Sequence, residues 1–234
     1  MKTNKLLLIF AVLLLASSYS FSQIKAVVGV TGSMLNYVDR NPISVELQVF
    51  DNAGIKVNST KSNAADNGYF YVTGLFPGNT YIFVVKDKNY LTERFEVSIP
   101  NSNKYVEISK DFLLKPNKGG TEIKLNVAPF EFNKSKLRPG SAIVLSEVLN
   151  TVKYNPNAKF KIVTYPDSDK NALQNEELTK SRAQALIDYF ELNGVDSSMF
   201  TIQTNKNTDP KNPPPAEKRA KGKKYIGSIY LVVG

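Results

Sequence analysis

Apolar and polar residues alternate with a period of two in the first half of the chain. Val45, Leu47 and Val49 alternate with Glu46 and Gln48, as in a strand with one buried face. Similar short apolar runs follow, and turn sequences separate them. The expected strands are 45–49, 69–72, 81–85 and a last one at 95–99, and the expected turns are 51–54, 66–68 and 76–79. Short strands with frequent turns indicate an antiparallel β-sandwich.

In the second half, apolar residues recur at intervals of three and four, which is the spacing of one helix face. This spacing predicts a helix that begins near Pro139 and stops at 155–157, and a second helix from Asn171 to Leu192 that Asn193-Gly194 ends. The expected strands are 127–132, 160–165, 200–204 and 225–233, with a loop at 205–215 and a short helix at 216–223. We therefore expect an α+β fold class: an antiparallel β-sandwich followed by an α/β sandwich, with two main helices packed on a mixed four-stranded sheet.

A polar segment rich in glycine separates the two patterns. It runs from Lys115 to Gly120 and interrupts two apolar regions. The chain is long enough for two domains of roughly 100 residues each. We expect a β-sandwich domain at 23–115, a linker at 116–121 and a second domain at 122–234.

The first 22 residues have the pattern of a secretory signal peptide. Lys2 and Lys5 flank the start of an apolar run, 6–16, and Ser20 and Ser22 are small residues placed for cleavage before Gln23. No later segment approaches about 18 apolar residues, so we expect no transmembrane segment in the mature chain. The expected location is the periplasm, with any association with the outer membrane made through partners.

The composition argues against enzymatic chemistry. The chain has no cysteine, histidine or tryptophan. It therefore lacks the usual general base near neutral pH, the Ser-His and Cys-His nucleophile systems, and the commonest metal ligands. We expect a protein that is not an enzyme and that uses no cofactor and no metal.

The basic excess of the chain is local. The precursor carries 30 basic and 21 acidic residues, a net charge of +9, and the segment 206–224 contains seven basic residues and two acidic ones. After export, nucleic acid is not an expected partner. Acidic wall polymers or membrane head groups suit such a segment better.

Two charged residues of the second domain stand out by their placement. Asp167 follows the apolar run 160–165, and Arg182 lies fifteen residues later within the second helix. One fixed negative and one fixed positive group suit a zwitterionic ligand such as an α-amino-acid head group. The alternative is a structural salt bridge, in which the two groups pair with each other or with neighbours.

The string D-N-G-Y-F-Y-V-T-G-L-F-P-G-N-T-Y, at 66–81, resembles the carboxypeptidase regulatory-like or transthyretin-like sandwich family. The resemblance covers about residues 25–115. Gly68 and Gly78 have a sufficient structural explanation as turn residues, and the aromatic residues as core. The resemblance implies an accessory or spacer domain without peptidase activity. We expect this domain to contact an envelope protein partner or to act as a spacer.

The second domain resembles the OmpA-like peptidoglycan-associating domain. The string F-E-F-N-K-S-K-L-R-P, at 130–139, is similar to the opening of that family, and the resemblance continues through Asn155-Pro-Asn157, Asn175-x-x-Leu178-x-x-Ser181-Arg182-Ala183 and Lys218-Arg219-Ala220. It covers roughly residues 122–234. The family implies binding of the diaminopimelate of the peptidoglycan stem peptide.

The resemblance assigns site residues one by one. The family's aspartate matches Asp167 and its arginine matches Arg182, while Asn175 matches an asparagine two helical turns before the arginine. Asn175 would add an amide contact to the ligand; the alternative is a hydrogen bond at the loop or helix start.

The sequence departs from the family pattern at several places, including two that involve further candidate site residues. Tyr165-Pro166 stands where the family commonly has His-Thr, and Tyr165 can still pack or donate a bond. Gly222-Lys223-Lys224 replaces the usual Asn-Arg-Arg. Lys223 and Lys224 would support attraction to an acidic polymer, or form a solvated face.

The sequence leads to one main hypothesis and two alternatives. The main one is a periplasmic protein that binds peptidoglycan non-covalently and tethers an envelope assembly to the cell wall. The first alternative is an interaction or scaffold subunit of a secretion or motility complex, with a diverged OmpA-like domain that no longer binds the wall. The second is a wall hydrolase using Glu176 and Glu177, whose side chains point about 100° apart on a helix and make a poor acid–base pair.

Overall fold

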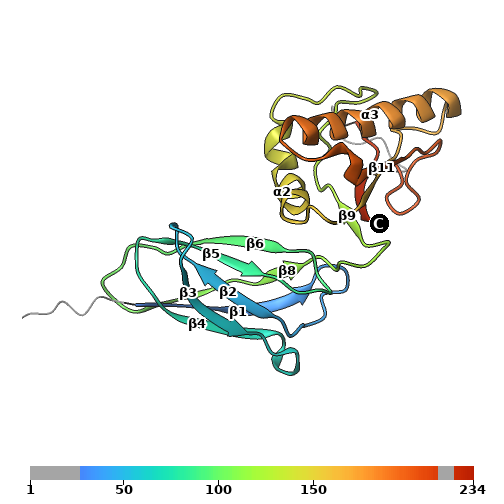
Figure 1. Ribbon diagram of the computed structural model, residues 1–234. Coiled ribbons are helices and arrows are strands. Elements are labelled where there is room, and N and C mark those ends of the chain that lie inside the picture. Colours follow the sequence, from blue (N-terminus) through green and yellow to red (C-terminus); the bar gives the residue numbers. More distant parts are fainter. Residues whose placement is uncertain (1–26, 216–223) are drawn as a thin grey trace, which may run out of the picture.

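The computed structural model describes residues 27–215 and 224–234, which form a β-sandwich followed by an α/β domain (Figure 1). The expected signal peptide and the expected short helix at 216–223 lie outside the described residues. In the described part, no helix is both long enough and apolar enough to cross a membrane.

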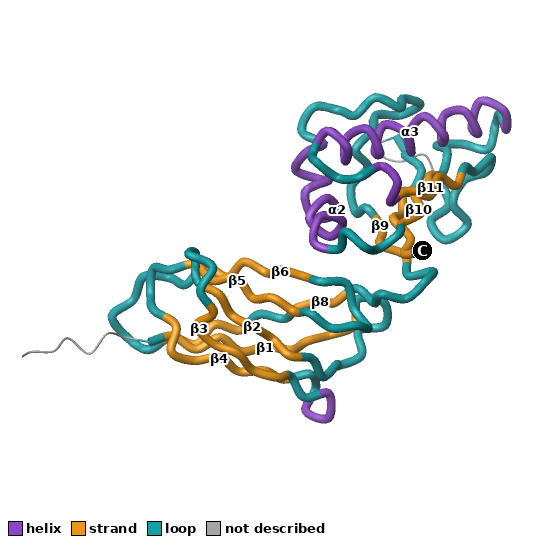
Figure 2. Tube along the Cα trace, in the orientation of Figure 1, coloured by secondary structure: helices purple, strands orange, loops and turns teal. Residues whose placement is uncertain are grey.

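The N-terminal domain contains two sheets that face each other (Figure 2). The first sheet consists of β4 (Tyr69–Leu75), β1 (Val28–Asn36), β7 (Val106–Ser109) and β8 (Phe112–Leu114). The second has the order β3 (Lys56–Lys61), β2 (Glu46–Phe50), β5 (Thr80–Val85) and β6 (Glu93–Ser98). β1 is antiparallel to β4 but parallel to β7 and β8.

Alternating residues of both sheets fill the core between them. Leu47, Val49, Phe70 and Phe83 are at most 1% exposed, and Phe70 and Phe112 stack with their ring centroids 5.5 Å apart. Apolar and polar residues therefore alternate at 45–49 because one face of this strand packs into the core, as expected.

Four strands of the sandwich were not expected. β1, β3, β7 and β8 have weaker patterns: β1 contains two glycines, and β3 is polar with no buried residue. The expectation that 95–99 is the last strand of this domain was wrong. The chain continues beyond Pro100 and adds β7 and β8 beside β1.

The C-terminal domain packs two helices on one face of a four-stranded sheet. The sheet has the order β11 (Phe200–Gln203), β10 (Phe160–Thr164), β12 (Ile229–Val233) and β9 (Glu122–Lys124), and the helices are α2 (Ser141–Tyr154) and α3 (Ala172–Leu192). β10 is parallel to β11 and antiparallel to β12, so the sheet is mixed. The expected fold class, an α+β protein with a sandwich and a two-helix α/β domain, is confirmed.

Both helices end and begin as the sequence predicts. The Asn171 side chain accepts a bond from the Gln174 N–H at the start of α3, and Gly194 follows the helix with φ 83°. That left-handed conformation suits glycine, which has no Cβ to strain it. The α2 helix gives way to a turn at Asn155, where Pro156 follows.

Two of the expected strands were wrong in position. Residues 127–132 form a loop, and the first strand of the domain is β9 instead. Phe130 is fully buried although its backbone forms only an isolated bridge to Leu137, so its apolar character comes from core packing and not from a strand. The last strand begins at Ile229 and not at 225, because Gly227 is held against the end of β10, as described below.

The two domains are joined by a packed and hydrogen-bonded junction. Leu91, in the sandwich loop before β6, is fully buried in the core cluster of the C-terminal domain. The Asn155 side chain accepts a bond from the Thr92 N–H at 2.7 Å and donates to the Thr92 carbonyl at 3.1 Å. The segment 116–121, expected as a linker, runs between these contacts and β9.

A charged triad strengthens this junction. Lys115 is 4% exposed, and its Nζ lies 3.0 Å from Glu93 of the sandwich and 3.1 Å from Glu147 of α2. Burial lowers the lysine pKa, but the two carboxylates outweigh it and the pKa of Lys115 is raised. Arg94 also lies over the Tyr154 ring, 4.8 Å from its centroid.

Candidate functional site

The structure brings Asp167 and Arg182 together. Asp167 follows β10, and Arg182 lies on the face of α3 that is turned toward the sheet. Arg182 Nη1 donates to Asp167 Oδ1 at 2.7 Å, and Nη2 donates to Oδ2 at 2.8 Å. Both side chains are completely buried. The pair therefore has the forked, bidentate geometry of a strong charge-assisted interaction.

Two further N–H groups of the guanidinium donate to backbone carbonyls. Arg182 Nε donates to the carbonyl of Lys134 at 2.9 Å, and Nη2 also donates to the carbonyl of Glu131 at 3.1 Å. The guanidinium carbon lies 5.3 Å from the centroid of the Phe130 ring. The loop 130–134 thus wraps around one side of the pair.

The carboxylate of Asp167 is bound on both oxygens by backbone amides as well. The Asn133 N–H donates to Oδ2 at 2.7 Å, and the Gly227 N–H donates to Oδ1 at 2.8 Å. Each oxygen therefore accepts one bond from Arg182 and one from the backbone. Together these bonds offset the desolvation of a buried ion pair, which is otherwise expensive.

Glycine is required at one of these contacts. A Cβ on Gly227 would lie 2.0 Å from the carbonyl oxygen of Tyr165 and 2.5 Å from that of Pro166. Only a residue without a side chain can bring its N–H this close to the end of β10. Sequence reasoning missed Gly227 and Asn133, because a backbone donor leaves little signal in a sequence.

Asn175 does not contact the pair. Its amide donates to the carbonyl of Ser168 at 2.6 Å and to the carbonyl of Lys206 at 2.8 Å, and the residue is 7% exposed. Asp169 accepts bonds from the N–H and the hydroxyl of Thr208, at 2.6 and 3.0 Å. Both side chains thus hold the loop after β11 against the start of α3.

Tyr165 packs on the face of the sheet that the helices leave open. Its ring meets that of Tyr230 edge-on, with centroids 6.1 Å apart, and it joins a small cluster with Val163 and Val232. Burial, followed by the charges of Asp209 and Glu122, raises the pKa of Tyr165.

Asp209 anchors the loop over this same face. The residue is fully buried and its Oδ2 accepts bonds from Tyr230 Oη at 2.6 Å and Asn212 Nδ2 at 2.9 Å. Burial alone would raise the pKa of Asp209, but these bonds and one from the Lys211 N–H outweigh it, and the pKa is lowered. The proline-rich segment 205–215 is a loop, as expected, and is fixed by an internal carboxylate.

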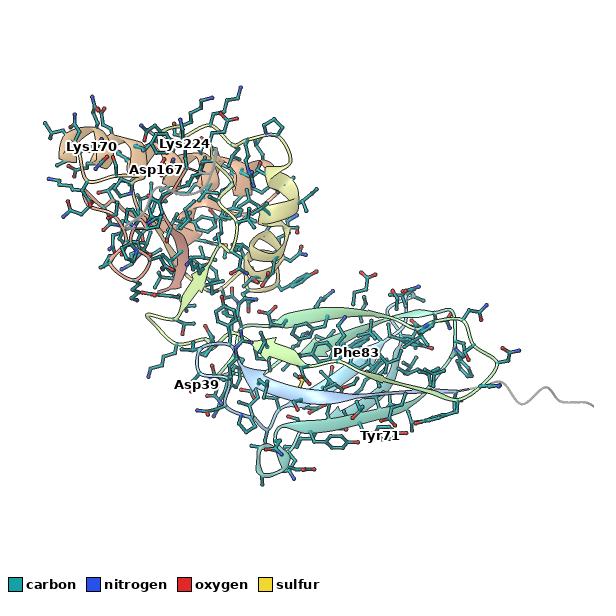
Figure 3. All side chains as sticks on the ribbon, turned by 180° about the vertical axis from the view of Figure 1, so that it is seen from behind. Asp39, Tyr71, Phe83, Asp167, Lys170 and Lys224 are labelled. Atoms are coloured by element: carbon teal, nitrogen blue, oxygen red, sulfur yellow. The ribbon has the colours of Figure 1, made fainter. Side chains whose placement is uncertain are left out.

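Basic side chains lie around the loop that covers the pair. Lys224 Nζ is 4.8 Å from the centroid of the Phe132 ring, and Figure 3 shows Lys224, Lys170 and Asp167 in the C-terminal domain, away from the sandwich. Lys223 lies outside the described residues. Arg138, at the end of the same loop, has a buried Nε with no hydrogen-bond partner in the described parts of the chain.

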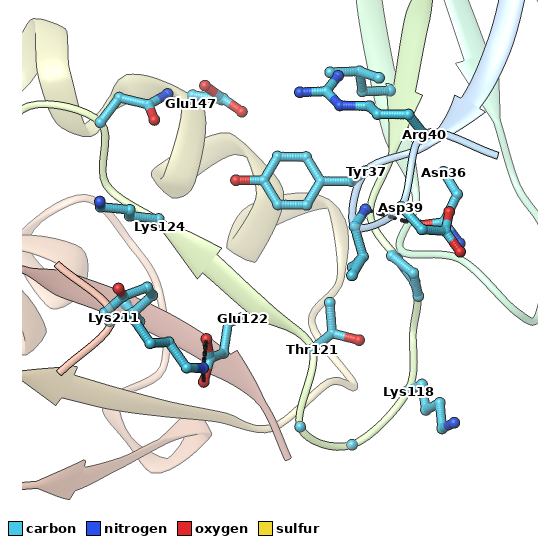
Figure 4. A pocket seen from close by; sticks show the side chains of 17 residues that line it. Asn36, Tyr37, Asp39, Arg40, Lys118, Thr121, Glu122, Lys124, Glu147 and Lys211 are labelled. Atoms are coloured by element: carbon cyan, nitrogen blue, oxygen red, sulfur yellow. Dashed lines mark hydrogen bonds and ion pairs between the residues drawn. The ribbon is translucent and has the colours of Figure 1, made fainter. Parts of the chain in front are cut away.

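A cavity of about 940 Å³ lies elsewhere, between the two domains (Figure 4). Tyr37, Arg40 and Asp39 line it from the sandwich, and Glu122 and Lys211 line it from the C-terminal domain. Lys211 Nζ lies 2.6 Å from Glu122 Oε2. The cavity does not include Asp167 or Arg182.

The acidic side chains of residues 27–215 and 224–234 are dispersed over the two domains or paired with basic groups. No group of three or more acidic side chains there is placed to hold a metal ion. Glu176 pairs with Lys206 at 3.2 Å, while Glu177 is exposed on α3. The Asp167–Arg182 pair can exchange partners. Each of its two charged groups can bind a ligand group of opposite charge if the loop 130–134 moves away.

Comparisons with known proteins assign the C-terminal domain. Residues 129–223 match the OmpA family, so this part of the chain is an OmpA family domain. No curated protein sequence matches the chain. The family match does not extend to the N-terminal region, so the resemblance of that region to the carboxypeptidase regulatory-like family stays a prediction.

Several solved structures are similar to parts of the chain. The OmpA-like domain of FopA1 from Francisella tularensis subsp. tularensis SCHU S4 has 15% identity and a TM-score of 0.36, over 50% of this chain and 83% of that one. The peptidoglycan-associated lipoprotein from Burkholderia pseudomallei has 16% identity and a TM-score of 0.36, over 50% and 91%. The Bacillus anthracis TIE protein has 17% identity and a TM-score of 0.32; the match covers 38% of this chain and only 16% of that protein.

Proposed function

We propose that this protein, through its OmpA family domain, binds peptidoglycan non-covalently in the periplasm and tethers an envelope assembly to the cell wall. The observation that carries the proposal is the family match at 129–223, which includes the buried Asp167–Arg182 pair. The protein acts as a binding protein and catalyses no reaction. The N-terminal sandwich contacts the envelope partner.

The finer part of the proposal is recognition of diaminopimelate in the stem peptide. The free end of this residue carries an ammonium and a carboxylate. Its carboxylate would replace Asp167 on the Arg182 guanidinium, and its ammonium would replace Arg182 on Asp167. After the exchange each of the two charged groups still has a partner of opposite charge.

The loop 130–134 has to open for this exchange, because it supplies two carbonyls to Arg182 and one amide to Asp167. Glu131, Asn133 and Lys134 at its tip are exposed. Asn133 has φ 54°, a left-handed conformation that costs a residue other than glycine some energy. The loop is therefore the part of the site best suited to move. Its closure lowers the apparent affinity for the ligand.

Other residues support this site in different ways. Asn175 and Tyr165 hold the surroundings in place, the first through the loop at Lys206 and the second through Tyr230. Lys224, together with Lys223, adds general attraction to an acidic polymer.

A second candidate function is an interaction or scaffold subunit whose OmpA family domain does not bind the wall. The burial of both charged groups and their internal bonds favour it, since they give the pair a structural role without any ligand. In this case the pair holds the loop 130–134 and Gly227 against the end of β10.

Binding to purified sacculi decides between the two functions. The mature chain is mixed with sacculi, and the bound fraction is measured after centrifugation. The variant Asp167→Asn/Arg182→Met removes both charges while it keeps similar volumes, because such replacements are often tolerated where single ones are not. If the wild-type chain binds sacculi and this folded variant does not, the result supports the tether. If the wild-type chain does not bind, the result supports the scaffold.

A further inference from the structure

Three tyrosines form an exposed strip on the outer face of the first sheet of the sandwich. This tyrosine strip consists of Tyr69 and Tyr71 on β4 and Tyr105 next to β7, which are 44%, 38% and 54% exposed. Figure 3 shows Tyr71 on the side of the sandwich that faces away from the C-terminal domain. The opposite face of the sheet, with Phe70 and Val72, is buried in the core.

Gly29 of β1 forms the floor under two of these rings. A Cβ at this position would lie 2.8 Å from Tyr105 Oη and 3.0 Å from Tyr71 Cε2. The rings of both tyrosines therefore reach across β1 from its two neighbouring strands, β4 and β7. Any larger residue at this position would push the rings away from the sheet. Glycine lets the rings lie close to it.

The polar ends of the rings are oriented by hydrogen bonds. Tyr71 Oη and Tyr105 Oη are 3.2 Å apart, and Tyr105 Oη donates to Glu107 Oε2 at 3.2 Å. The strip is thus a preorganised aromatic surface with a hydrogen-bond acceptor, the Glu107 carboxylate, at its edge.

The charge of this face differs from that of the whole molecule. The outward positions of β1, β4 and β7 carry hydroxyl groups beside the tyrosines, at Ser33, Thr73 and Ser109, while Thr31 between them is buried and donates to the carbonyl of Phe70. Glu107 is their one charged side chain, although the chain carries a net charge of +9. An acidic polymer is therefore a poor partner for this face, and a neutral molecule rich in hydroxyls is a good one.

We propose that the tyrosine strip binds the glycan strands of the cell wall. Each pyranose ring has an apolar face of C–H groups that stacks on an aromatic ring, and its hydroxyl and amide groups can bond with Tyr hydroxyls and a carboxylate. Tyr69 and Tyr71 are two residues apart on one strand, about 7 Å, so successive rings meet successive parts of an extended chain.

The inference rests on the proposed function, because attachment to the wall brings glycan to the protein. It concerns a different polymer component and a different domain from the stem-peptide site. The sandwich would bind the sugar chain while the OmpA family domain binds the peptide branch. Two weak contacts on one chain raise the overall affinity for an extended wall.

Chitohexaose, a soluble chain of N-acetylglucosamine, serves as the probe for a glycan strand. It is titrated into the full mature chain by calorimetry and by NMR. We expect saturable binding by the wild-type chain, and at least tenfold weaker binding by Gly29→Ala and Tyr71→Ala. Leu192→Ala removes an 87% exposed apolar side chain from α3 and should bind as the wild type does.

Gly29→Ala separates binding from folding, since its Cβ meets only the flexible ends of two side chains and its melting temperature should stay near that of the wild type. No saturable binding by the wild-type chain, or equal binding by Gly29→Ala, overturns the inference. The wild-type chain could instead self-associate without binding chitohexaose, and Gly29→Ala could abolish that self-association. This result also overturns the inference and assigns the strip to contact with a second copy of the chain. Sacculus binding without chitohexaose binding overturns this inference alone, whereas no sacculus binding overturns the proposed function.

Discussion

Arg182 Nη1 lies 2.7 Å from Asp167 Oδ1, and neither side chain has any contact with solvent. The sequence places these residues on different elements, and the fold joins them into a closed pair. The pair is held by the loop 130–134 and by Gly227. Any ligand for it must therefore compete with bonds that the protein already makes.

The first prediction concerns the energy of the pair. Arg182→Ala leaves the Asp167 carboxylate buried without its partner, and we expect a loss of about 3–5 kcal/mol in the free energy of unfolding. Arg182→Lys keeps the charge but loses the fork, and should be destabilised as well. Urea unfolding of the mature chain measures both. A loss below about 1 kcal/mol, typical of exposed pairs, would contradict the buried geometry.

The second prediction concerns Asn175. Because its amide holds the carbonyls of Ser168 and Lys206, Asn175→Ala should cost about 1–3 kcal/mol and loosen the loop after β11. Hydrogen exchange at the Thr208 amide, which donates to Asp169, should become faster. Gln174→Ala, on the exposed side of the same helix turn, is the control and should leave this exchange unchanged.

The third prediction concerns acid stability. The pKa of Asp209 is lowered in the folded protein, so its contribution to stability is full above the ordinary aspartate value, about 3.9, and is lost as the pH falls through the lowered value. Asp209→Asn should cost about 1–3 kcal/mol at neutral pH. The difference between wild type and variant should shrink as the pH falls below about 3.9. Unfolding curves at several pH values test this, and a difference independent of pH would count against it.

The fourth prediction concerns the junction between the domains. Lys115→Met removes the cation between Glu93 and Glu147, leaves Glu93 buried without it, and should loosen the contact of the sandwich with α2. Scanning calorimetry should show one transition in the wild-type chain and two in this variant. Glu147→Gln is the control, because that side chain is 67% exposed and its loss should change stability by less than about 1 kcal/mol. Two transitions already in the wild type would show that the domains are not coupled.

Hydrophobic periodicity and helix-capping residues predicted those strands and helices whose buried face is encoded in their own sequence. The alternating residues at 45–49 form a strand face that packs into the core. The apolar residues spaced by three and four in α2 and α3 likewise form the buried faces of these helices. β7 and β8 were missed because they are short strands that pair with a distant partner, β1. Phe130 was misread as part of a strand because burial in a loop looks the same in a sequence.

The site could be predicted in part for a similar reason. Charged side chains at matched positions pointed to Asp167 and Arg182, and the structure brings them together. The backbone donors of Asn133 and Gly227 left no pattern, although they decide that the pair is closed. Asn175 was placed on the same helix face as Arg182, but its amide is used by a loop far along the chain.

The most direct test of the central claim is an NMR titration of the mature chain with a stem tetrapeptide. The peptide with diaminopimelate at its third position offers a side-chain ammonium and carboxylate, whereas the matched peptide with lysine offers only the ammonium. The amide signals of Asn133 and Gly227, which donate to Asp167, report on the exchange. We expect both signals to shift and saturate with the first peptide only. Unchanged signals at the two amides with either peptide would contradict recognition at this pair.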